Sequence, residues 1–182
     1  MRNVARNSGW TSGRQRWSTV LIGILSLHAC DSPTAVQPPP IQTDALSYTL
    51  VPTGNGFETE IRYVFTNETE GPVYLVNCRG AFSLILERKS GGKWAQAWTP
   101  VARLCLSAPI VIARGETLEG VVHVWGAKPG GNAGPRFDVA DPSGTYRMVW
   151  TSALSSFQDH LPFGPQIPAE FRISNSFELL LP

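Results

Sequence analysis

The side chains best suited to acid–base or metal chemistry are the histidines, and the sequence offers few useful arrangements of them. His160 directly follows Asp159, and His123 lies four residues after Glu119. Adjacent residues in an extended segment point in opposite directions, so the Asp159-His160 pair favours a solvated loop over a metal ligand or a general base. About 13 Å of strand would separate Glu119 from His123, too far for both to bind one ion. The sequence therefore predicts no metal site.

Patterns for nucleophilic catalysis and phosphate binding are also missing from the sequence. There is no Gly-x-Ser-x-Gly motif, and Cys105 is flanked by two leucines, which favours a structural role. The glycine-rich segment 126–134 lacks a Gly-Lys-Ser/Thr ending and does not lead into a helix, so it does not match a phosphate-binding loop. We therefore expect a protein that is not an enzyme and needs no cofactor.

The N-terminal sequence around Cys30 predicts a different kind of chemistry. Four arginines and no acidic residue precede the apolar run Val20–Leu27, which is far shorter than the ~20 residues of a membrane-spanning helix. The run ends in Leu27-His28-Ala29-Cys30 and resembles the lipobox of bacterial lipoproteins, with an unusual histidine in second place. The resemblance implies cleavage before Cys30 and attachment of acyl chains to it. The alternative is an ordinary secretory signal with a coincidental cysteine.

This interpretation divides the chain into three parts: a signal peptide at 1–29, a lipid-anchored proline-rich linker at 30–43, and a domain at 44–182. The linker holds four prolines and no aromatic residue, so an extended tether is expected. The anchor would hold the protein on a membrane of the bacterial cell envelope. Asp31, which follows the cysteine, does not decide between the inner and the outer membrane. Without the signal peptide, 11 basic residues face 14 acidic ones, which argues against nucleic acid as a partner.

Cys78 and Cys105 are the two cysteines that remain after lipidation of Cys30. An even pair in an exported domain predicts a disulfide bond. The alternative, two buried thiols, would require a reducing compartment, against which the signal peptide argues.

The rest of the sequence favours strands. Apolar and polar residues alternate over residues 57–66, 117–125 and 144–151, and Trp94 and Trp98 are predicted to share one face of a strand. Seven to nine short strands separated by turn signals, with no helix of ten residues, predict an all-β fold, an antiparallel β-sandwich.

The order of the strands and two short motifs support a resemblance. An alternating strand, a Lys93-Trp94 strand, the turn Arg114-Gly115-Glu116 and the strand Gly144-Thr145-Tyr146-Arg147 resemble immunoglobulin-like modules of bacterial envelope proteins. They are also similar to the sandwich of the intracellular proteinase inhibitor family. The resemblance covers residues 44–181 and implies an immunoglobulin-like fold without catalytic residues.

Four aromatic or histidine side chains are candidates for a binding surface. Trp125 lies on the polar face of its strand beside the glycine-rich segment, and the others belong to the long segment 152–173: Phe157, His160 and Phe163. We therefore expect a lipid-anchored domain that binds an envelope protein or a glycan. The alternative is a proteinase inhibitor that presents the segment 152–173 to a protease.

Overall fold

The computed structural model describes residues 38–54, 56–101, 107–127, 134–158 and 164–182. The predicted signal peptide and Cys30 lie outside these residues. Within the described part of the chain, no helix is long and apolar enough to cross a membrane.

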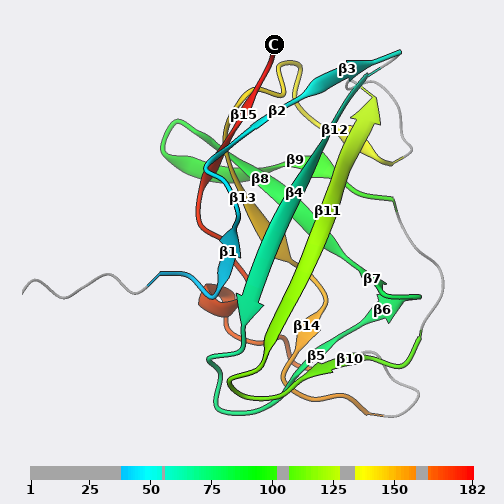
Figure 1. Cartoon of the computed structure of the whole chain (residues 1–182), viewed down its shortest axis with the longest axis vertical. Helices are drawn as coiled ribbons and strands as arrows, with labels where there is room; N and C mark the ends of the chain where they lie inside the picture. The colour runs from blue at the N-terminus through cyan, green and yellow to red at the C-terminus, as the bar shows by residue number, and fades with distance from the viewer. Residues whose placement is uncertain (1–37, 55, 102–106, 128–133, 159–163) are drawn as a thin grey trace, which may run out of the picture. The chain divides into compact units, whose positions relative to one another are not determined.

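Two long antiparallel strands, β4 (Gly56–Thr66) and β11 (Thr117–Ala127), pair along all eleven of their residues (Figure 1). Both follow the predicted alternation. The side chains of Phe57, Ile61, Tyr63 and Phe65 are buried, whereas Glu60 and Arg62 are exposed. On β11 the side chains of Val122 and Val124 are buried, whereas those of Val121, His123 and Trp125 are exposed. The pair therefore has one face toward the core and one toward solvent.

A ten-stranded sheet contains this pair, in the order β1-β4-β11-β12-β9-β8-β13-β15-β2, with β3 also on β4. Its other strands are β1 (Ile41–Thr43), β2 (Ser47–Thr49), β3 (Val51–Thr53), β8 (Leu84–Ser90), β9 (Lys93–Thr99), β12 (Arg136–Phe137), β13 (Gly144–Trp150) and β15 (Phe177–Leu180). Since β1 and β3 pair with β4 while β2 pairs with β15, the segment 41–53 joins the two ends of the sheet. The last residues of the predicted linker, 41–43, form β1 and so belong to the folded part.

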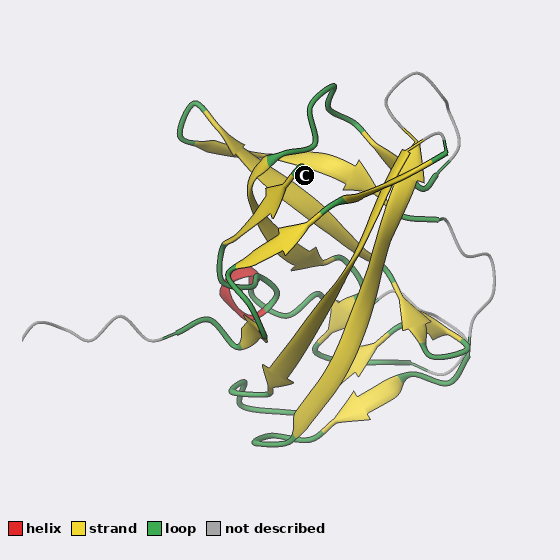
Figure 2. Cartoon of the chain, turned by 45° about the horizontal axis from the view of Figure 1, so that its top comes forward, coloured by secondary structure: helices red, strands yellow, loops and turns green. Residues whose placement is uncertain are grey.

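Two small sheets complete the described fold. One has three strands in the order β10-β5-β14, and the other is the pair of β6 and β7. Their bounds are β5 (Val73–Leu75), β6 (Asn77–Cys78), β7 (Ala81–Phe82), β10 (Ile110–Ile112) and β14 (Ala153–Leu154). A single turn of 3₁₀ helix, η1 (Ala169–Phe171), is the sole helical element of the described residues (Figure 2). The predicted all-β, antiparallel character is confirmed, and several two- and three-residue strands add to the seven to nine predicted.

Trp150 of β13 lies at the centre of the core. Its side chain is fully buried, and its ring packs against those of Tyr63, Phe65 and Phe82 at centroid distances of 5.9, 4.7 and 5.1 Å. Tyr146 and Met148 of the same strand are also fully buried, as the alternation of β13 predicts. The core therefore joins β13 to the inner face of β4 and to the short strand β7.

The prediction that Trp94 and Trp98 share one face of β9 is wrong. The pairing of β8 with β9 shifts between Leu86 and Glu87, so that Leu86 lies opposite Trp98 but Glu87 lies opposite Gln96. The extra residue, Ala97, is buried, and the bulge reverses the alternation on either side of it. Trp98 consequently faces the core, whereas Trp94 lies on the outer face, where the Arg147 guanidinium sits 4.5 Å from its ring centroid.

The loop after β4 is organised by Asn67, which is fully buried. Its amide nitrogen donates hydrogen bonds to the carbonyls of Gly71 and Ile112 at 2.9 and 2.8 Å, and its amide oxygen accepts from the Thr69 backbone N–H and hydroxyl. These bonds tie the loop to β10. The Asn67-Glu68-Thr69 sequence therefore has a structural role in this loop.

Candidate binding cavity

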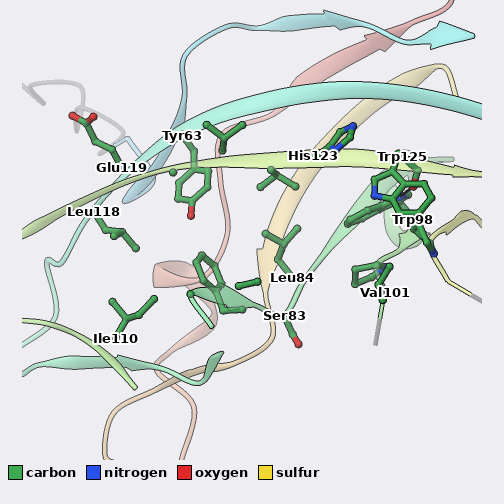
Figure 3. A pocket seen from close by; sticks show the side chains of 18 residues that line it. Tyr63, Ser83, Leu84, Trp98, Val101, Ile110, Leu118, Glu119, His123 and Trp125 are labelled. Carbon is green, nitrogen blue, oxygen red and sulfur yellow. Dashed lines mark hydrogen bonds between the residues drawn. The ribbon is translucent and has the colours of Figure 1, made fainter. Parts of the chain in front are cut away.

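A cavity of about 420 Å³ lies where the large sheet is least continuous. Beyond β4, the strand β11 pairs with β12 through Ala127 and Arg136, and β12 in turn pairs with β9 through two residues. Over residues 117–126, no described strand other than β4 pairs with β11. The cavity opens there, between β11 on one side and β7, β8 and β10 on the other (Figure 3).

The lining of the cavity mixes apolar and aromatic side chains with polar groups, among them Ser83, Glu119 and His123. It comes from segments far apart in the sequence and includes Phe82, Leu84, Trp98, Val101, Ile110 and Leu118. Trp98 is nearly fully buried, whereas Val101 keeps 42% of its surface exposed. The walls therefore pass from the core to the surface, as in a site that a ligand can enter.

Tyr63 places a hydroxyl in this apolar lining. It reaches the cavity because Gly120, opposite it on β11, has no side chain: a Cβ there would lie 2.2 Å from the Tyr63 hydroxyl oxygen. The hydroxyl points toward the residues across the cavity (Figure 3). Burial raises the pKa of Tyr63 to about 12, so the group stays protonated at neutral pH and can donate a hydrogen bond to a ligand.

Trp125 and His123 form the outer rim of the cavity. Both project from the solvent-facing side of β11, their ring centroids are 6.4 Å apart, and Trp125 is 47% exposed. The His123 Nε2 lies 3.5 Å from a carboxylate oxygen of Glu58 on the neighbouring strand. Trp98 donates a hydrogen bond from its indole Nε1 to the Trp125 backbone carbonyl at 3.0 Å, which fixes this end of β11 to β9.

The described residues offer no metal site at the cavity. No three of their histidine, cysteine, aspartate and glutamate side chains gather closely enough to hold a metal ion. Glu119 and His123 both line the cavity, but they lie four residues apart on one strand. The arrangement is suited to binding, with walls of apolar and polar groups, the buried Tyr63 hydroxyl and an aromatic rim.

The structure places the predicted site residues in different surroundings. Trp125 lines the cavity, whereas Phe157 does not: its ring stacks on Tyr74 of β5, with centroids 6.3 Å apart. Cys78 is half-buried at the end of β6. Four residues lie outside the described part of the chain and stay predictions: Cys30, Cys105, His160 and Phe163.

Sequence reasoning missed most of the cavity lining. In the sequence, Tyr63 lies on the apolar face of an alternating strand, as a core residue would, and Phe82 and Ile110 lie in short apolar stretches without any mark of a site. The one available signal was Gly120, a glycine inside a long alternating strand, because such a glycine indicates a close approach by another group.

Neither the protein-family models nor the curated proteins contain a match to this chain.

Proposed function

We propose that this protein is a lipid-anchored, non-catalytic binding domain of the bacterial cell envelope, and that it holds its partner at the cavity beside β11. One observation carries the binding part: a cavity of about 420 Å³, lined by apolar, aromatic and polar side chains and by the Tyr63 hydroxyl, opens where β11 has only β4 beside it among the described strands. The anchor rests on the sequence around Cys30. An envelope protein or a glycan is the proposed partner, and the cavity offers a wall of aromatic rings to either.

The alternative, a proteinase inhibitor, has less support from the described residues. An inhibitor presents a protruding segment to the cleft of a protease, whereas the site found here is concave. The segment 152–173 is held to the fold at several described points: β14 pairs with β5, Leu154 bridges to Gln166, and Ile167 donates its backbone N–H to the Ala153 carbonyl at 3.1 Å.

We also propose that the all-β fold is an immunoglobulin-like sandwich. The antiparallel pairing, the buried aromatic residues and the hairpin of β8 and β9 support it. The grouping of ten strands in one sheet, whose ends are joined through residues 41–53, differs from two separate sheets. The cavity does not depend on this classification, because it is defined by β11 and its neighbours.

Cross-linking in the host tests the binding site. We expect a photo-reactive p-benzoylphenylalanine in place of Trp125 to give a discrete cross-linked adduct in the envelope. The same residue in place of Leu180, which is 45% exposed on β15 and does not line the cavity, serves as the matched control. Adding Ile110→Trp, which fills the cavity from β10, should remove the adduct. Equal adducts at both positions, or an adduct insensitive to Ile110→Trp, would contradict binding at the cavity.

Fractionation of the host tests the anchor. Cys30→Ser removes the sulfur that would carry the diacylglyceryl group, so we expect the variant to leave the detergent-phase fraction that holds the parent protein. Mass spectrometry of the parent should show a chain that begins at Cys30 with added acyl mass. A parent chain that starts elsewhere or carries no lipid would overturn the anchored localisation.

A further inference from the structure

On the side of β11 away from β4, the backbone groups of Glu119, Val121 and His123 form no hydrogen bond with another described strand. In an antiparallel pair, successive residues direct their backbone groups alternately toward the partner strand and away from it. The Arg62 carbonyl on β4 accepts a bond from Asp44 at 3.1 Å and so points away from β11. Val121, which lies opposite Arg62, must therefore direct its own N–H and C=O away from β4.

The same direction holds for every second residue of β11, which includes Glu119, His123 and Trp125. The bond from the Trp98 indole to the Trp125 carbonyl, on the side away from β4, agrees with this assignment. Glu119, Val121 and His123 all line the cavity, and no backbone bond joins them to another described strand. Along about 13 Å of strand, donors and acceptors alternate at the spacing of a β-ladder, and no strand of the described residues occupies the next position.

This edge already accepts a strand at its far end. There β12 pairs with β11 in parallel through Arg136 and Ala127, and the Arg136 and Asp138 side chains of that segment form an ion pair at 2.6 Å. An incoming strand over Glu119 to His123 would continue the sheet from the position that β12 occupies. Strand addition at this edge therefore extends a pairing that the fold itself uses.

The cavity supplies space for a side chain of such a strand. Every second side chain of an added strand would point to the inner face of β11, where Gly120 has none of its own and the Tyr63 hydroxyl lies behind it. Phe82, Ile110 and Leu118 surround this space. The alternate side chains of the strand would lie outside, next to Val121 and Trp125, which are 50% and 47% exposed.

We propose that the partner binds as an extended peptide segment that adds a strand to the free edge of β11 and inserts one large apolar or aromatic side chain into the cavity. This inference rests on the proposed function and specifies the partner as a polypeptide. A glycan could stack on Trp125, but it has no regular series of amide donors and carbonyl acceptors to match those of Glu119, Val121 and His123.

N-methylation of a bound peptide tests the inference without altering the protein. The full chain, purified in detergent micelles, would be used to select linear peptides from a phage-displayed library, with the Ile110→Trp chain as the counter-selection. A selected peptide is then synthesised with a single N-methyl group at each position in turn, and the Kd of each is measured by fluorescence anisotropy. We expect losses of roughly tenfold at alternate positions and little change at the positions between them, because strand addition uses every second amide.

A pair of variants makes the matching test on the protein. Val121→Pro removes one backbone donor at the edge of β11 that faces the cavity, where proline is compatible with a strand, and Val121→Ala shortens the side chain but keeps the donor. We expect Val121→Pro to weaken the peptide several-fold more than Val121→Ala does. Independently, the bound peptide should slow hydrogen exchange of the Glu119, Val121 and His123 amides in the parent chain.

The outcomes separate this inference from the function on which it rests. A selected peptide whose affinity changes evenly along the N-methyl scan, without protection of these amides, would overturn strand addition. Failure to enrich any linear peptide over the counter-selection would overturn the peptide as partner. In both cases an adduct at position 125 that Ile110→Trp removes would leave binding at the cavity standing.

Discussion

Replacing Trp150 by alanine is expected to lower the free energy of unfolding by about 3–5 kcal/mol, a large part of the ~5–15 kcal/mol that stabilises a domain. The indole is fully buried, and its ring contacts those of Tyr63, Phe65 and Phe82. Its removal would leave a cavity among the rings of β4 and β7. The strands that hold these rings are paired with their neighbours, so the rings can move only partly into the space. Urea unfolding followed by circular dichroism measures the loss.

Trp94 offers a matched control for this experiment, because it is the same residue type on the outer face of the sheet. It lies on the outer face, where its ring centroid is 4.5 Å from the Arg147 guanidinium carbon and 5.9 Å from the Lys89 ammonium nitrogen. Trp94→Ala should cost about 1 kcal/mol, the scale of an exposed cation–π contact. If the two alanine variants lost similar amounts, the assignment of Trp150 to the centre of the core would be wrong.

The contrast between the two tryptophans also shows what alternation in the sequence can predict. Burial on β4, β11 and β13 follows a period of two because these strands are regular, and their inner residues were predicted correctly. On β9 the bulge at Ala97 shifts the pattern by one residue, and nothing in Lys93–Thr99 marks it. A bulge depends on the register against β8, which is set by contacts beyond the strand itself.

The cavity was beyond the reach of the sequence for a related reason. Trp125 was noticed because it breaks the pattern of its own strand. Tyr63 lies on the apolar face of an alternating strand, and Phe82 and Ile110 lie in short apolar stretches, so each looks like an ordinary core position. They form a site because, among the described strands, β11 has only β4 beside it over most of its length, and strand order in a sheet is a property of the whole chain. Gly120 is the residue whose type carried information about this place.

The second large effect is expected at Cys78 and Cys105, which we propose to be joined by a disulfide bond. The described residues beside them support this pairing. Ser107 donates its backbone N–H to the Asn77 carbonyl at 2.9 Å, and its hydroxyl accepts from the Arg79 backbone N–H at 2.9 Å. The two residues that flank Cys78 are thus hydrogen-bonded to Ser107, which is only two positions after Cys105. Two residues of chain span at most ~7 Å, so the Cα atoms of Cys78 and Cys105 are within reach of a disulfide bond.

Reduction of this bond should lower the free energy of unfolding by about 3–4 kcal/mol, because the closed loop of nearly thirty residues restricts the unfolded chain. The closed loop contains β7, β8 and β9. In the unfolded state, reduction therefore frees the segment whose strands β7 and β8 line the cavity opposite β11 in the folded protein. The measurement compares urea unfolding of the oxidised parent, the reduced parent and the Cys78→Ser/Cys105→Ser chain.

The double serine chain is the control for the reductant, since it should unfold at the same urea concentration with and without it. Equal stability of the oxidised parent and the double serine chain would contradict the bond, as would alkylation of both cysteines in the oxidised parent before reduction. Because β7 and β8 supply one wall of the cavity, loss of the bond should also weaken the cross-link at position 125, whereas Trp94→Ala should leave that cross-link intact.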